Sequence, residues 1–128
     1  MRNSVIHGVV SVILTLSLLI PTIMVPSGIA QAATVPTVET RPASSISQTT
    51  AFLNGRIISD GGSAILERRF DWGTTSSCAD GWTASVGVSR NYFAFYLTGL
   101  NPGTTYYFRA WAKNSMGWTR GSVLSFTT

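Results

Sequence analysis

The side chains able to do acid–base, nucleophilic or metal chemistry are few in this chain of 128 residues. Its only histidine is His7, close to the N-terminus, and its only cysteine is Cys78. Beyond His7, neither a Ser-His-Asp nor a Cys-His arrangement can form, and most zinc sites lack a ligand. Cys78 would need some other base to become a nucleophile.

The acidic residues also fail to make a catalytic pattern. Glu67 and Asp71 share one face of a predicted strand, with about 13 Å between them, more than a glycosidase carboxylate pair requires. Asp60 and Asp80 fall in separate predicted loops, and no Asp-x-Asp calcium loop is present. No glycine-rich phosphate motif follows a strand and opens a helix. The sequence therefore predicts no enzyme, no metal site and no cofactor.

Aromatic and cationic side chains in the segment TYYFRAWAKN, residues 105–114, are the best candidates for binding. Alternate residues of a strand point to opposite faces, so four of them form one outward stripe. These are Tyr107, Arg109, Trp111 and Lys113. Trp and Arg are favoured at protein interfaces, and flat exposed aromatics can stack on sugar rings. Alternatively, the Arg and Lys stems only cover the rings, through cation–π contacts of about 0.5–1 kcal/mol.

Residues on other segments could extend this stripe. Arg69 and Asp71 of the neighbouring strand are expected to share its face. Trp118 is predicted in a loop, SMGWTRG, at the same end of the fold as the turn at 60–62, whereas Trp82 is expected near the other end. Loops at one end of a sandwich often bind ligands, so Trp118 is a further binding candidate. The alternative is that Trp118 caps the core.

Period-two alternation of apolar residues indicates β-strands in the segments that must position these side chains. About seven short strands, turn signals every 8–12 residues and no helix beyond residue 32 predict an all-β sandwich of two antiparallel sheets. Residues 33–48 are predicted as a lead-in and edge strand, and WTASVGV as a weak strand. Tyr92 and Tyr96 should face outward on the second sheet, and the lead-in strand is a candidate to cover them. Inward positions are predicted for Phe93, Phe95, Leu97, Tyr106, Phe108, Ala110, Leu124 and Phe126. Leu53 and Ile57 are expected to share one face of their strand, and Phe70 and Trp72 one face of theirs.

Residues 1–32 have the pattern of a secretory signal-peptide helix. Arg2 supplies a positive start, and residues 9–25 are uncharged and rich in Val, Leu and Ile. Ala30 and Ala32 occupy the small-residue positions that signal peptidase requires, which predicts cleavage after Ala32 and a secreted or cell-surface domain over residues 33–128. The alternative is a retained membrane anchor, because the apolar run is about as long as a short spanning helix.

Charge and cysteine content limit the partners of the exported part. Removing Arg2 leaves eight basic against five acidic residues, a net charge of +3. The basic residues are scattered, and the adjacent Arg68 and Arg69 point to opposite faces, which argues against nucleic-acid binding. Cys78 cannot form a disulfide within the chain. It could link two copies into a dimer, or it is a loop thiol without a role in a monomer.

Several motifs in fixed order carry a resemblance to a known family. The segment LNPGTTYYFRAWAKNSMGWTRGSVLSFTT resembles the second half of a fibronectin type III domain, through a Leu-x-Pro-Gly-Thr-x-Tyr corner and a closing SFTT. Upstream, TTAFLNGRIISDGG and FDWGTT are similar to the bacterial and archaeal extracellular variety of that domain. The resemblance covers nearly all of residues 36–128 and implies an immunoglobulin-like sandwich.

The resemblance also implies structural roles. Tyr106 would be the tyrosine corner, with its hydroxyl bonded to backbone just upstream and its ring in the core. Leu100, Pro102 and Gly103 would have structural roles in the same corner motif. Phe70 would lie in the core, and Trp72 would fill the volume of a tryptophan that animal domains carry on the second strand. At 120–122 the sequence reads Arg-Gly-Ser, so integrin-like recognition through Arg-Gly-Asp is not implied.

The family implies a secreted, non-catalytic module that serves as a spacer, adhesion or protein-binding unit. Alternatives are a carbohydrate-binding accessory module that uses Tyr107, Trp111 and Trp118, or a fragment of a larger surface protein or secreted hydrolase. The partner would be an extracellular protein or a polysaccharide.

Overall fold

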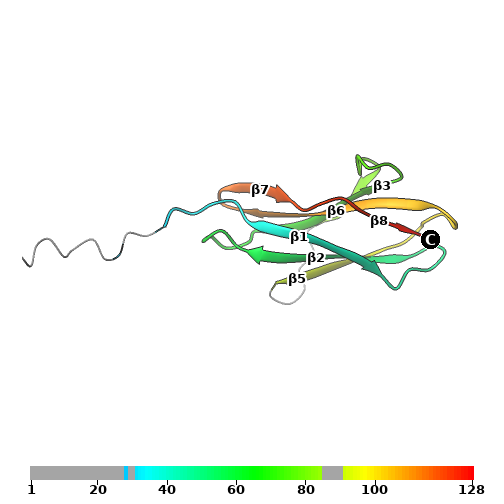
Figure 1. Ribbon diagram of the computed structural model, residues 1–128, viewed down its shortest axis with the longest axis horizontal. Coiled ribbons are helices and arrows are strands. Elements are labelled where there is room, and N and C mark those ends of the chain that lie inside the picture. Colours follow the sequence, from blue (N-terminus) through cyan, green and yellow to red (C-terminus); the bar gives the residue numbers. More distant parts are fainter. Residues whose placement is uncertain (1–27, 29–30, 85–90) are drawn as a thin grey trace, which may run out of the picture. The chain divides into compact units, whose positions relative to one another are not determined.

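A computed structural model describes residues 28, 31–84 and 91–128. These residues form eight β-strands and no helix. The signal-peptide prediction falls mostly outside these residues. Residues Ala32–Thr128 form one compact unit. Within the described chain, no helix has the length and apolarity needed to cross a membrane. The strands are β1 (Thr37–Ser44), β2 (Ala51–Ser59), β3 (Glu67–Gly73), β4 (Gly81–Trp82), β5 (Tyr92–Leu97), β6 (Thr105–Asn114), β7 (Gly117–Arg120) and β8 (Leu124–Thr127) (Figure 1).

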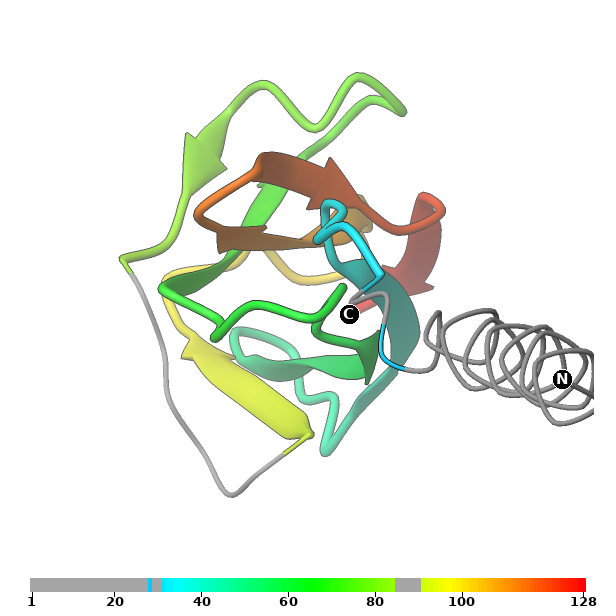
Figure 2. The same ribbon diagram turned by 90° about the vertical axis from the view of Figure 1, so that its left-hand side faces the viewer.

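The strands form two antiparallel sheets that lie face to face (Figure 2). One sheet has the order β1-β2-β5, and the other has the order β4-β3-β6-β7 with β8 also paired to β6. β7 and β8 thus follow one side of β6 in succession, separated by residues 121–123. At this break β1 approaches closely: a Cβ on Gly121 would lie 2.5 Å from Thr40 Oγ1. Thr40 Oγ1 also accepts a hydrogen bond from the Ala110 amide at 3.0 Å, which ties the edge of one sheet to the other.

Large aromatic side chains meet small residues in the core, as two interdigitating sheets require. Phe70 lies between Phe93 and Phe108, with ring centroids at 5.1 and 6.4 Å. All three rings are fully buried. Gly55 leaves room for the Phe93 ring, because a Cβ there would lie 2.5 Å from its Cζ.

The predicted alternation is confirmed along β2 and β6, where buried and more exposed residues follow one another. The predicted inward residues lie in the core or pack against it; Trp72, Phe95 and Leu124 are partly buried. The prediction for WTASVGV is only partly described: β4 ends at Trp82, and residues 85–90 lie outside the described chain.

Two sequence predictions about the strands are wrong. The segment SMGWTRG is not a loop, since Gly117–Arg120 form β7 after a tight turn in which Asn114 pairs with Gly117. Gly117 takes a φ of +136° there, a conformation that other residues rarely adopt. The lead-in strand does not cover Tyr92 and Tyr96, because β1 pairs with the far side of β2, and the two tyrosines remain 54% and 50% exposed.

The Asn114 side chain connects three backbone segments at the end of the sandwich where this turn lies. Its buried side-chain Nδ2 donates to the carbonyl oxygens of Thr34 at 2.6 Å and Asp60 at 2.8 Å, and its Oδ1 accepts from the Met116 amide at 2.8 Å. The Thr34 amide donates to the Gly61 carbonyl at 2.8 Å. The backbone just after the predicted cleavage site is therefore held by the fold.

Candidate functional site

The outer face of the β3–β6–β7 sheet gathers most of the predicted binding residues. Cross-strand pairing places Arg69 opposite Trp111, and Trp111 opposite Arg120 on the other side. We call this surface the cationic–aromatic face. It comprises Glu67, Arg69, Asp71, Trp82, Tyr107, Arg109, Trp111, Lys113, Trp118 and Arg120.

Arg69 is the centre of the cationic–aromatic face. Its guanidinium carbon lies 4.6 Å from the ring centroid of Trp118, 5.0 Å from that of Trp111 and 5.7 Å from that of Trp82. The three tryptophans come from β4, β6 and β7, so one cation joins side chains of three strands to β3. At these distances each ring quadrupole attracts the cation.

Further cations surround the same rings. The guanidinium carbons of Arg109 and Arg120 lie 5.3 and 5.6 Å from the Trp111 ring centroid. Trp118 meets Trp111 edge to face at 6.2 Å and 87°, and Lys113 Nζ lies 5.5 Å from the Trp118 ring. Cations and rings therefore alternate across the sheet.

Two carboxylates offset part of the positive charge. Asp71 lies 3.5 Å from Arg109 Nη2 and 3.7 Å from Arg69 Nε, and Glu67 lies 3.8 Å from Lys113 Nζ. These separations are long for hydrogen bonds, so the pairs act as charge contacts. The Asp71 side chain is 13% exposed and that of Arg109 18%, so this pair is only weakly screened by solvent.

The accessible parts of the face lie at its margins. Trp82 is 68% exposed, and Arg120 is exposed at the end of β7. Trp111 and Trp118 are half-buried, with cations stacked against them. Tyr107 is half-buried farther along β6, opposite Gly73 and Ser125. The covering of rings by Arg and Lys stems, weighed above as an alternative, thus exists for Trp111 and Trp118.

Sequence reasoning placed Trp118 and Trp82 at opposite ends of the fold, and this was wrong. Both rings contact the guanidinium of Arg69, at 4.6 and 5.7 Å. Trp82 was not among the predicted binding residues. Its pairing with Asp71 through the short strand β4 brings it to the face. The weak strand predicted from Trp82 onward did not indicate this partner.

The structural roles implied by the resemblance are borne out at the tyrosine corner. The Tyr106 hydroxyl accepts a hydrogen bond from the Asn101 amide at 2.8 Å, and the ring is 3% exposed. Trp72 packs edge-on against Tyr106 at 6.1 Å. Leu100 is buried, whereas Pro102 and Gly103 form the exposed turn before β6, where Gly103 has a φ of +63°.

Cys78 is buried in the loop that follows β3, with 3% of its surface exposed. Desolvation by burial raises the pKa of its thiol above the ordinary value; the Arg109 guanidinium acts in the opposite direction and the Asp71 carboxylate in the same one. Sγ lies 3.7 Å from the Ser76 carbonyl oxygen. A disulfide between two copies would therefore require this loop to open. The Cys78-linked dimer stays a prediction.

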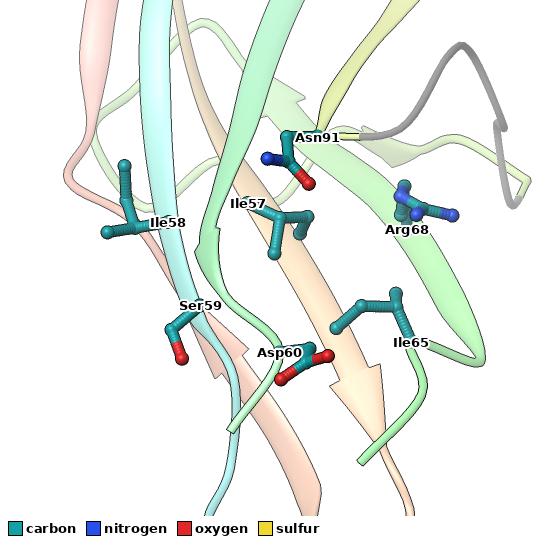
Figure 3. A pocket seen from close by; sticks show the side chains of 7 residues that line it. All are labelled: Ile57, Ile58, Ser59, Asp60, Ile65, Arg68 and Asn91. Atoms are coloured by element: carbon teal, nitrogen blue, oxygen red, sulfur yellow. The ribbon is translucent and has the colours of Figure 1, made fainter. Parts of the chain in front are cut away.

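A hollow of about 260 Å³ lies at the end of the sandwich where β2 leaves its sheet (Figure 3). Ile57, Ile58, Asp60 and Ile65 are among the residues that line it (Figure 3). Its remaining lining residues are Ser59, Arg68 and Asn91. Its volume is below the usual 300–1,000 Å³ of small-molecule sites. Among the described residues no group of three His, Cys, Asp or Glu side chains could hold a metal ion.

Solved structures share this architecture. The sensor domain of the anti-sigma factor RsgI4 from Pseudobacteroides cellulosolvens matches with a TM-score of 0.55 at 20% identity, over 76% of this chain and 97% of that one. The sixth fibronectin type III domain of human fibronectin type III domain containing protein 3 matches with a TM-score of 0.50 at 24% identity, over 80% and 90%. Domains A168–A170 of titin match with a TM-score of 0.51 at 26% identity, over 75% of this chain and 33% of that one.

The fold is fibronectin type III-like. No family model and no curated protein matches the chain. The likeness confirms the two-sheet sandwich predicted from the sequence. The function of a fibronectin type III-like domain depends on the side chains on its surface. Here the cationic–aromatic face brings together aromatic and charged side chains of β3, β4, β6 and β7.

Proposed function

We propose that this fibronectin type III-like domain is a non-catalytic extracellular module that binds a protein partner through the cationic–aromatic face. The convergence of Trp82, Trp111 and Trp118 on Arg69 carries the proposal. Export follows from the predicted signal peptide and remains part of the proposal. The fold supplies a rigid sheet, and the face supplies the residue types that contribute most to protein interfaces.

Preorganisation makes the face suited to binding. The packed rings and the Asp71 carboxylate restrict the arginine side chains before a partner arrives, which lowers the entropy lost on binding. The exposed ring of Trp82 and the exposed Arg120 would make direct contact, while Trp111 and Trp118 support them from behind. Four cations and two carboxylates give the face a net charge of +2, which favours an acidic partner surface.

A polysaccharide partner is the second candidate, and the open ring of Trp82 favours it. Sugar stacking needs a free ring face, and Trp82 is 68% exposed. Tyr107, Trp111 and Trp118 are less suited than the sequence suggested, because they are half-buried and cations lie against the two tryptophans. A spacer role, or a place within a larger surface protein or secreted hydrolase, is the remaining alternative.

Photo-cross-linking at position 82 tests the proposal. A benzophenone amino acid replaces Trp82, and the matched control carries it at Ile46, an exposed residue of the turn between β1 and β2. On irradiated producing cells we expect one protein adduct of discrete mass from position 82 and none from position 46. Excess unlabelled wild-type protein should compete, and the variant Arg69→Ala/Arg120→Glu should not. Equal adducts from both positions, or none from either, would contradict a partner site on this face.

Retention on insoluble polysaccharides separates the second candidate. If a protein is the partner, the wild type should pass through unretained. The contrary result is a wild type that is retained, a Trp82→Ala or Trp111→Ala variant that is not, and an Ile46→Ala control that is retained like the wild type. That result would assign the face to a polysaccharide instead.

A further inference from the structure

The free edge of β5 lies on the sheet opposite the cationic–aromatic face. β5 closes the sheet β1-β2-β5, and among the described strands it pairs only with β2. Figures 1 and 2 show it as the outermost strand of its layer. Proteins usually protect such edges with charged side chains, proline or a bulge. The strand YFAFYL has no charge and no proline, and its register with β2 runs without a shift.

The sequence of this edge is a palindrome. Residues 92–96 read Tyr-Phe-Ala-Phe-Tyr, centred on Ala94. If two copies of β5 pair antiparallel about a two-fold axis at Ala94, every residue faces its own type: Ala94 meets Ala94, Tyr92 meets Tyr96, and Phe93 meets Phe95. A two-fold interface requires such self-complementarity.

The backbone presents the matching hydrogen-bond groups. The carbonyl of Asn91 accepts from the Ile57 amide at 2.7 Å, so odd-numbered residues of β5 direct their backbone groups toward β2. Alternation along an antiparallel strand then directs the N–H and C=O groups of Tyr92, Ala94 and Tyr96 to the free edge. These residues are the ones that an axis at Ala94 pairs with one another, so each pair could exchange both of its hydrogen bonds.

We propose that β5 pairs with β5 of a second copy of this chain, antiparallel about an axis at Ala94, and joins two three-stranded sheets into one. The inference concerns a different surface from the proposed function and does not depend on it.

Charge and side-chain chemistry favour a second copy over a foreign strand. The chain beyond residue 32 carries a net charge of +3, so two copies repel each other. The strand β5 itself has no charged residue, so pairing along it places no like charges of the two strands opposite each other. On the outer face Tyr96 lies 4.8 Å from Phe52, and Arg56 lies over Tyr92 at 5.5 Å. The paired strands would continue this row of aromatic rings across the axis, and cross-strand aromatic pairs stabilise sheets.

The area of the contact indicates a weak dimer. Tyr92 and Tyr96 are 54% and 50% exposed. Since an aromatic side chain buries about 150–250 Å², the tyrosines and backbone edges of two copies would bury on the order of 600 Å², below the roughly 1,200 Å² of stable interfaces. Association should therefore depend on concentration and increase where copies are held together on one surface.

Sedimentation velocity of the protein expressed from the full sequence, with reductant present, tests the pairing. Between about 10 µM and 1 mM we expect the average mass to rise toward that of a dimer. Tyr92→Lys/Tyr96→Lys and Tyr92→Glu/Tyr96→Glu should each stay monomeric, because like charges would face each other. An equimolar mixture of the two variants should dimerise at least as well as the wild type. The matched control Ile58→Lys places a charge on the same sheet face away from the edge and should dimerise as the wild type does.

Amide hydrogen exchange on the wild type gives a readout that needs no variant. With increasing concentration the amides of Tyr92, Ala94 and Tyr96 should gain protection, whereas those of Phe93 and Phe95 should not change.

Ala94→Pro removes the central donor at an edge position that tolerates proline, and it should abolish the dimer. A wild type that is monomeric up to about 1 mM, a dimer that the like-charge pairs leave intact, or a mixture no better than its components would overturn the proposal.

Discussion

The hydroxyl of Tyr106 offers a clean test of the corner that begins β6. It accepts the Asn101 amide at 2.8 Å, while its ring packs 5.7 Å from Phe126 and 6.1 Å from Trp72. Tyr106→Phe removes only the oxygen and leaves the ring in place. The Asn101 amide then loses its acceptor in a partly buried position, which should lower the free energy of unfolding by about 1–2 kcal/mol.

Urea unfolding followed by tryptophan fluorescence measures this loss. A domain of this size has a denaturant slope of about 1–1.5 kcal/mol/M, so the midpoint should fall by about 1 M with the slope unchanged. An unchanged slope indicates that the variant buries the same surface as the wild type. The lost free energy can then be assigned to the single hydrogen bond.

Tyr107→Phe is the matched control, because it removes the same atom from the next residue. Tyr107 lies half-buried on the outer face, and in the described chain its hydroxyl makes no hydrogen bond to the Asn101 backbone. Its midpoint should stay close to that of the wild type. Equal midpoints for wild type and Tyr106→Phe, or an equal fall in both variants, would refute the tyrosine-corner reasoning.

Three further perturbations address the core, the cationic–aromatic face and the buried thiol. Gly55→Ala forces a Cβ to within 2.5 Å of Phe93 Cζ, and thermal unfolding should show a loss of about 1–3 kcal/mol. Arg69→Ala removes the cation shared by three tryptophans; urea unfolding should show a loss of about 1–2 kcal/mol, with little change for the exposed Arg41→Ala. Native Cys78 should react with a thiol reagent far more slowly than the unfolded chain, and rapid labelling would contradict its burial. Folding raises the pKa of Cys78, so the buried neutral thiol contributes fully to stability below the ordinary thiol pKa. This contribution is lost as the pH rises through the pKa of the folded state. Urea midpoints measured over a series of pH values should therefore fall in that range.

Features that depend on local alternation could be predicted from the sequence. Strand residues point alternately to two faces, so the buried positions of β2 and β6 and the outward stripe around Trp111 followed from the period of two. The hydroxyl bond of Tyr106 followed from the resemblance, because Leu100, Pro102 and Gly103 stand at the corner's fixed spacing.

Features that depend on pairing between distant segments could not be predicted. Trp118 looked like a loop residue because Gly117 and Gly121 flank it, yet it lies in the short strand β7. Gly117 forms the hairpin turn, and Gly121 leaves room for the close approach of Thr40. The approach of Trp82 to Arg69 depends on the two-residue strand β4. Such a strand has no period of its own, so only the structure places Trp82 on the face.

The convergence of three tryptophans on Arg69 is the geometry from which the proposed binding role follows. It is tested most directly by nuclear Overhauser contacts between the Arg69 side chain and the indole rings in solution. Contacts to Trp82, Trp111 and Trp118 together, at distances that match 5.7, 5.0 and 4.6 Å between guanidinium and ring centroid, are the predicted result. An Arg69 side chain that averages freely in solvent, without contacts to Trp111 and Trp118, would contradict it.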